Sequence, residues 1–145
     1  MSQTCPISFA RIDAHFVRII AVEVISLALL LIFTQNIIFA LILLFDFTMR
    51  TLNLKKLSPL AHVAQALIKQ FEIKPLLCDE APKRFALYVG VTIIALFTLL
   101  YLFKLNILAS VLVAILLLCA FLEATFDYCV GCKVYHLLQY LQKKK

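Results

Sequence analysis

The sequence predicts an all-α integral membrane protein with four transmembrane helices, arranged as two hairpins, plus a cytoplasmic amphipathic helix. Two observations indicate this class. Hydrophobic residues make up 64% of the chain and charged residues only 15%, whereas soluble globular domains contain about half apolar and about a quarter charged residues. The apolar residues also stand in long blocks, not at the regular spacing of half-buried helices or strands.

Four blocks predict membrane spans within a single membrane domain, residues 1–145: about 16–33, 37–54, 85–103 and 107–126. The third block contains no charged residue and is long enough to cross a bilayer. The second block is interrupted by Asp46 and Arg50, which lie four residues apart on one helical face and can form an ion pair. A re-entrant or interfacial segment is the alternative for this block.

The basic residues predict the orientation of the chain. If all four blocks span, both termini and the segment 50–84 lie on one side, and that side holds every Lys and Arg except Lys104. The positive-inside bias places this side in the cytoplasm. The basic residues are scattered along the membrane borders without a basic, aromatic-bearing domain behind them, so we expect no binding to nucleic acid.

A surface helix is predicted between the two hairpins, over about 58–74. Ser58 is a typical N-cap, and Pro59 suits the first helical position. Apolar residues then recur at helical spacing up to the break at Lys74-Pro75: Leu60, Val63, Ala64, Leu67, Ile68 and Phe71. We expect this helix to lie on the cytoplasmic surface, and a second, shorter amphipathic helix to begin after Gly131.

The chain has only two glycines. Gly90 lies inside the third span, where a small residue lets helices approach closely. Gly131 stands where the fourth helix is expected to end, and glycine commonly ends helices in the left-handed conformation. This assignment puts Cys129 in the last turn of one helix and Cys132 at the start of the next.

Three thiols are candidate reactive groups. A cysteine at a helix N-terminus gains thiolate character from the helix dipole, and Cys132 and Cys5, which precedes Pro6, are expected at such positions. Because the first and last helices of a compact bundle are often neighbours, we expect Cys5, Cys129 and Cys132 to cluster at the cytoplasmic face. Cys78 is a weaker candidate for a reactive thiol, because the carboxylates of Asp79 and Glu80 beside it would raise its pKa. Cys119 is expected to pack as a small apolar residue in the fourth span.

Three interpretations of these thiols remain open. They can be catalytic, redox-sensing or sulfur-carrying, or they can be structural. They can also bind zinc together with one of the histidines His15, His62 and His136, but the sequence contains no second paired motif, so no metal site is predicted. A structural disulfide is not expected in the reducing cytoplasm. No pattern identifies a cofactor.

Acidic residues in the spans form a second candidate set. Glu23, Asp46 and Glu123 lie within or near the apolar blocks, and Glu123 shares a helical face with Asp127. Ionisable groups at such depth are costly unless they are paired or hydrated. Ion pairs between helices, with partners such as Arg18, Lys83 or Arg84, are one explanation, and a role in binding a ligand, a proton or an ion is the other.

Four ordered motifs carry a resemblance to a known family. They are Cys5-Pro6, Leu57-Ser58-Pro59-Leu60-Ala61, Ala81-Pro82-Lys83-Arg84-Phe85-Ala86, and Leu122-Glu123-Ala124 leading to Phe126-Asp127-Tyr128-Cys129-Val130-Gly131-Cys132 with Tyr135. Together they resemble an uncharacterised family of small bacterial membrane proteins, domain of unknown function four-three-nine-five. The resemblance covers nearly the whole chain and implies a multi-pass protein of the bacterial inner membrane, but it implies no activity.

The leading hypothesis is a membrane-embedded thiol protein that handles redox equivalents or sulfur. Cys132 or Cys5 would be the reactive thiolate, and Cys129 would resolve it as a disulfide. Positive charge would come from Lys83, Arg84 and Lys133, and the expected binding residues are Lys83, Arg84, Glu123 and Asp127. A soluble thiol or sulfur-carrier protein is the expected partner at the cytoplasmic face.

Two rival hypotheses come from other classes. A small transporter or channel component would use the intramembrane carboxylates, and because four spans are few for a monomeric pathway, it would be a homo-oligomer. A membrane scaffold would instead recruit a soluble protein through the basic cytoplasmic face.

Overall fold

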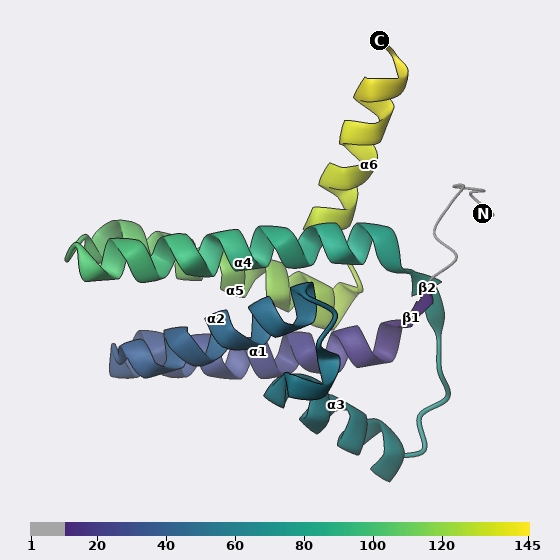
Figure 1. Ribbon diagram of the computed structural model, residues 1–145, viewed down its shortest axis with the longest axis horizontal. Helices are drawn as coiled ribbons and strands as arrows, with labels where there is room; N and C mark the ends of the chain where they lie inside the picture. The colour runs from purple at the N-terminus through teal and green to yellow at the C-terminus, as the bar shows by residue number, and fades with distance from the viewer. Residues whose placement is uncertain (1–10) are drawn as a thin grey trace.

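The computed structural model describes residues 11–145, which are mainly helical (Figure 1). In chain order the elements are β1 (Arg11–Asp13), α1 (Ala14–Thr34), α2 (Ile37–Thr51), the short 3-10 helix η1 (Lys55–Leu57), α3 (Pro59–Gln70), β2 (Leu77–Asp79), α4 (Glu80–Leu102), α5 (Asn106–Phe126) and α6 (Val130–Lys143). The predicted helical class is confirmed. The predicted position of Cys5 lies outside the described residues.

Three helices of the described chain, α1, α4 and α5, are long and apolar enough to cross a membrane. Their outer faces expose many large apolar side chains, including Leu30, Leu99 and Leu118, as contact with lipid requires. The protein is therefore a membrane protein. Helix α2 has only 15 residues, which is about 22 Å of helix against about 30 Å of bilayer core. It ends at Thr51, short of the predicted boundary at 54, because Asn53 adopts a left-handed conformation and the chain turns away.

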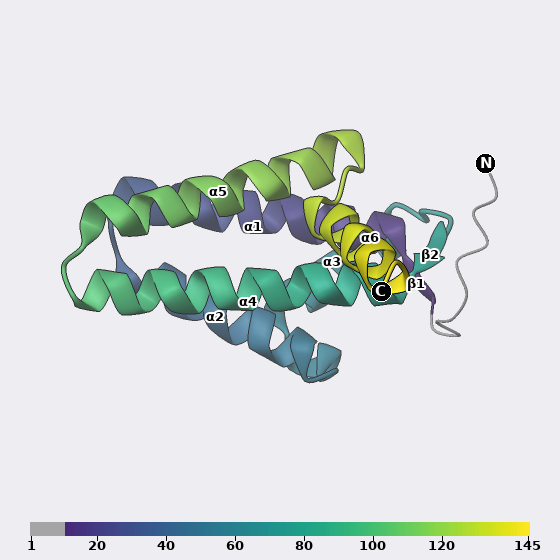
Figure 2. The ribbon, with the colours of Figure 1, turned by 90° about the horizontal axis from the view of Figure 1, so that it is seen from above.

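The four long helices form two layers, α1 with α2 and α4 with α5 (Figure 1). Seen from above, α5 lies over α1 and α4 lies over α2, so that α1 and α4 are diagonal to each other (Figure 2). The core between them includes Leu43, Ile94 and Val113, which are almost completely buried. We call the end of the bundle where α1 and α4 begin and α5 ends the thiol end, because Cys129 lies there.

The turns of the two hairpins lie at the opposite end. Gln35 adopts a left-handed conformation after α1, and Asn36 caps α2 by accepting a hydrogen bond from the N–H of Ile38 (3.0 Å). Lys104 makes the corresponding left-handed turn between α4 and α5. The hydroxyl of Tyr101 donates to the carbonyl of Gln35 (2.6 Å), which joins the two hairpins.

Asp46 holds α3 against the bundle. Its carboxylate is fully buried, accepts hydrogen bonds from the hydroxyl of Ser58 and the N–H of Leu60, and pairs with Arg50 at 2.9 Å. The predicted ion pair is thus confirmed, as are Ser58 as N-cap and Pro59 at the first position of α3. The helix ends at Gln70, before the predicted boundary at 74, and its buried side chains pack beside α1.

The two glycines have the same role. A Cβ atom on Gly90 would lie 2.8 Å from Cε1 of Phe47, which confirms the predicted close approach, here between α4 and α2. The prediction for Gly131 is wrong. Asp127 is the left-handed residue that ends α5, and Gly131 lies inside α6, where a Cβ atom would be 2.6 Å from Cβ of Ala86. Gly131 therefore permits α6 to contact α4.

A short antiparallel ribbon was not predicted. Strands β1 and β2 pair with Ile12 opposite Cys78, and the carboxylate of Asp13, the N-cap of α1, accepts hydrogen bonds from the N–H groups of His15 (3.0 Å) and Leu76 (3.1 Å). The ribbon therefore fastens the start of α1 beside the start of α4.

Candidate functional site

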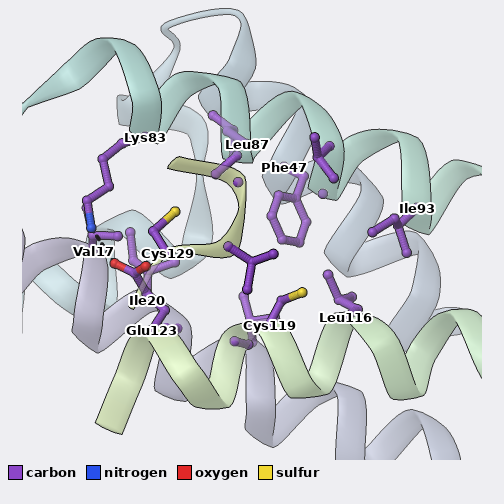
Figure 3. A pocket seen from close by; sticks show the side chains of 18 of the residues that line it. Val17, Ile20, Phe47, Lys83, Leu87, Ile93, Leu116, Cys119, Glu123 and Cys129 are labelled. Carbon is purple, nitrogen blue, oxygen red and sulfur yellow. Dashed lines mark hydrogen bonds and ion pairs between the residues drawn. The ribbon is translucent and has the colours of Figure 1, made fainter. Parts of the chain in front are cut away.

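A cavity of about 270 Å³ lies inside the bundle at the thiol end (Figure 3). Its walls are mostly apolar and come from five helices, with Ile20 on α1, Phe47 on α2, Leu87 on α4, Leu116 on α5 and Val134 on α6. The wall also includes five side chains with ionisable groups: Arg50, Lys83, Cys119, Glu123 and Cys129.

Cys129 is the N-cap of α6. The preceding residues leave α5 through the left-handed Asp127, and the sulfur of Cys129 accepts a hydrogen bond from the backbone N–H of Cys132 (3.3 Å). Its predicted position in the last turn of the fourth helix is therefore wrong. Cys132 lies in the first turn of α6, as predicted, but it is not among the residues that line the cavity.

The two thiols differ in acidity, in the opposite sense to the prediction. Hydrogen bonds from the thiol and the backbone N–H of Cys132 lower the pKa of Cys129 against the opposing effect of burial, while the Glu123 carboxylate raises it and the Lys83 ammonium lowers it. The same thiol–thiol hydrogen bond, together with burial, raises the pKa of Cys132. Both residues are free cysteines. A thiolate that accepts backbone and thiol hydrogen bonds is the stabilised species, so the geometry assigns the more nucleophilic sulfur to Cys129.

Lys83 and Glu123 form an ion pair at the cavity wall, from the first turn of α4 to the last turns of α5. The two side chains are only 14% and 9% exposed. In Figure 3 the ammonium of Lys83 points toward the carboxylate of Glu123, with Cys129 beside them. The sequence analysis selected all three residues, and the fold brings them together.

Three other selected residues do not reach the cavity. Arg84 is not among its lining residues. Asp127 pairs with Arg18 at 3.3 Å, where both side chains are 39% exposed, and the ammonium of Lys133 lies over the ring of Tyr128. A direct role in binding at this site is therefore not supported for Arg84, Asp127 or Lys133.

Arg50 is a cavity residue that the sequence analysis treated only as the partner of Asp46. Its side chain is 12% exposed and lies over the ring of Phe47. Within residues 11–145, its Nη2 atom is buried without a hydrogen-bond partner, and so are both carboxylate oxygens of Glu23. The sequence feature that could have identified Arg50 as a site residue is its position at the end of an apolar block. A guanidinium buried at such depth is costly unless it has partners.

Comparison with family models gives a match to the domain of unknown function DUF4395 over residues 12–140. The chain belongs to this family. No curated protein and no solved structure matches the chain.

In this DUF4395 protein the two other cysteines among residues 11–145 are Cys78 and Cys119. The Cys78 thiol donates to the carbonyl of Ile12 (3.3 Å), and burial raises the pKa of Cys78. Cys119 lines the cavity on α5. No group of three or more His, Cys, Asp or Glu side chains within residues 11–145 is placed to hold a metal ion.

Proposed function

We propose that this protein is a membrane-embedded thiol protein that handles redox equivalents or sulfur, with Cys129 as the nucleophile and Cys132 as the resolving thiol. The observation that carries the proposal is the position of the Cys129 sulfur, which caps α6, accepts the N–H of Cys132 and lines a cavity beside the Lys83 ammonium. Helix N-termini and adjacent cations are the environments that activate cysteines.

In the redox form of the proposal, the Cys129 thiolate attacks a disulfide R–S–S–R. A Cys129–S–S–R bond forms, and R–S⁻ leaves and takes a proton. The Cys132 thiol then loses its proton and attacks the Cys129 sulfur, which releases the second R–S⁻. The protein ends with a Cys129–Cys132 disulfide, and the substrate has gained two electrons and two protons.

In the sulfur-carrying form, the Cys129 thiolate attacks the terminal sulfur of a persulfide, R–S–SH. The terminal sulfur moves to Cys129, R–S⁻ leaves, and the proton of the persulfide passes to the leaving thiolate. Cys129 then carries one extra sulfur atom. Cys132, three residues away, can attack the inner sulfur and release this extra atom as hydrosulfide, which again leaves a Cys129–Cys132 disulfide.

The proposed topology has both termini in the cytoplasm of a bacterial cell, with α2 as a fourth, shorter membrane segment and α3 on the cytoplasmic surface. The distribution of basic residues supports this orientation. The thiol end then faces the cytoplasm, where Cys5 would join the cluster. The expected partner there is a soluble thiol or sulfur-carrier protein.

The test is the reaction of the purified, reduced protein with glutathione disulfide, followed by intact mass. Wild-type protein should form a Cys129–Cys132 disulfide. Cys132→Ser should stop at a glutathione adduct on Cys129, and Cys129→Ser should react slower by about tenfold or more, because the activated thiolate is lost. Cys78→Ser is the matched control and should react like the wild type. A wild-type rate in Cys129→Ser would refute the assignment.

A second candidate function, transport by a homo-oligomer, rests on Glu23. Both of its carboxylate oxygens are buried and without partners among the described residues, whereas Glu123 and Asp127 are paired with Lys83 and Arg18. Buried, unpaired carboxylates in membrane proteins are typical of proton or ion pathways. In proteoliposomes with an internal pH-sensitive dye, Glu23→Gln should abolish proton flux while the cysteine variants retain it; absence of flux in the wild type would eliminate this candidate.

A further inference from the structure

The cavity at the thiol end has the properties of a site for an uncharged, ring-shaped ligand from the membrane. Its volume of about 270 Å³ is close to the lower limit of small-molecule pockets, about 300 Å³. Three of the helices that line it are long and apolar enough to cross a membrane, and most of its lining is aliphatic or aromatic. A ligand that reaches it from the hydrocarbon needs no charged group.

The polar groups of the wall favour an acceptor of hydrogen bonds. Arg50 lines the cavity with its Nη2 atom buried and without a partner within residues 11–145, and Lys83 is the second donor. A buried donor without a partner is costly, so a ligand that accepts from it gains affinity. Carbonyl oxygens on a ring are such acceptors.

The charges of the wall disfavour an anionic ligand. Arg50 is paired with Asp46, Lys83 is paired with Glu123, and Glu23 lies close enough to Arg50 to interact with it. The cations are therefore already neutralised by carboxylates. A fatty-acid carboxylate would meet these acids, whereas a neutral carbonyl would not.

We propose that the cavity binds the ring of a lipid-soluble quinone and that Cys129 and Cys132 reduce it. This inference rests on the proposed thiol function and names its electron acceptor. The sulfur of Cys129 lines the same cavity as Arg50 and Lys83, so a ring held by these donors lies against the nucleophile.

The step balances as a two-electron transfer. The Cys129 thiolate adds to a ring carbon and forms an S–C bond. Cys132, on losing its proton, attacks the Cys129 sulfur, so that the S–S bond forms, the S–C bond breaks and its electron pair stays on the ring. The quinone oxygens take up two protons, one from the Cys132 thiol and one from water through the Lys83–Glu123 pair. The products are a Cys129–Cys132 disulfide and a hydroquinone.

The experiment uses decylubiquinone and the full chain in detergent. Binding is measured by calorimetry with the Cys129→Ser/Cys132→Ser double variant, and reduction is measured with the reduced wild type from the loss of quinone absorbance. We expect one saturable site and one hydroquinone for each disulfide formed. Ala120→Leu, which adds volume to the cavity wall, should weaken binding about tenfold or more, because overpacking a filled site is costly.

Ala114→Leu is the matched control, since Ala114 lies on the same helix but is exposed and does not line the cavity. It should bind like the wild type. Ile93→Phe fills the cavity from α4 and replaces Ala120→Leu if that variant loses its helical circular dichroism. Equal weakening by Ala114→Leu, or tighter binding of laurate than of decylubiquinone, would overturn the quinone site. Thiols that react with glutathione disulfide but leave decylubiquinone oxidised would overturn this inference alone. Thiols that react with neither would overturn the proposed function as well.

Discussion

Cys129 and Cys132 have different environments although they are three residues apart. One caps α6 and accepts hydrogen bonds, and the other donates from the first turn of the same helix. The pattern C-x-x-C predicted that these thiols belong together. It did not predict which one is activated, because that depends on whether α5 ends at Asp127 or at Gly131. Non-glycine residues are uncommon in the left-handed conformation, so glycine was the better candidate from sequence alone.

The lowered pKa of Cys129 makes a prediction about pH. A thiol whose pKa is depressed reacts as thiolate at lower pH, so the midpoint for alkylation of Cys129 by iodoacetamide should lie below about 8.5, the ordinary value for cysteine. Cys132→Ala removes the main hydrogen bond to the thiolate and should raise this midpoint. Peptide mass spectrometry over a pH series measures both.

Cys78 provides the internal reference for this series. Burial raises the pKa of Cys78, so its alkylation midpoint should lie above the ordinary value and should not change in Cys132→Ala. If the midpoint of Cys129 stays where it is in that variant, the thiol–thiol hydrogen bond is not the cause of its acidity.

Among the elements, the long apolar helices were the easiest to predict and the short pieces the hardest. Blocks of apolar residues identified α1, α4 and α5, and the Ser58-Pro59 signal located the start of α3. The ribbon of β1 and β2 has three residues in each strand, too few for a pattern of alternation, and it depends on the tertiary placement of Asp13. The end of α2 was also missed, because the chain turns at Asn53 in the left-handed conformation, which is uncommon for residues other than glycine.

Gly131 makes a prediction at the level of α6. In a helix, alanine is normally favoured over glycine by up to about 1 kcal/mol. Here, however, Gly131→Ala would place Cβ within 2.7 Å of the Ala86 backbone, which cannot move as a flexible side chain can. Overpacking of this kind costs about 1–3 kcal/mol, so the variant should be less stable in thermal unfolding and α6 should be cleaved faster by protease. Greater stability would show that α6 does not dock on α4.

For the whole molecule, the class could be predicted from charge and hydropathy, and Lys83, Glu123 and Cys129 could be selected as candidates from residue type and helix position, but their meeting at one cavity wall was not predicted. The cavity could not be predicted, because it depends on how five helices meet. Its wall includes Arg50, one residue before the end of α2. The periodicity of apolar residues in the sequence does not predict how these helices meet around the cavity.

The proposed topology makes a prediction for the whole chain. Single cysteines at Thr34 and Lys104, in a background without native cysteines, should react with a membrane-impermeant maleimide in intact cells. A cysteine at Lys143 should react only after permeabilisation. Labelling at Lys104 but not at Thr34 would mean that the turn between α1 and α2 does not reach the far surface, and labelling at Lys143 in intact cells would reverse the orientation.

The contribution of α6 to the cavity has a consequence for biosynthesis. Cys129, Gly131 and Val134 line the cavity together with Val17 near the start of α1. Domains form in the order in which the ribosome delivers the chain, so α1, α2, α4 and α5 are synthesised and can be inserted before the last wall of the cavity exists. The nucleophile is thus among the last components of the site to arrive. A nascent chain that stalls before Cys129 already contains the cavity walls from α1, α2, α4 and α5 and the Lys83–Glu123 pair. It lacks the Cys129–Cys132 thiol pair and cannot react.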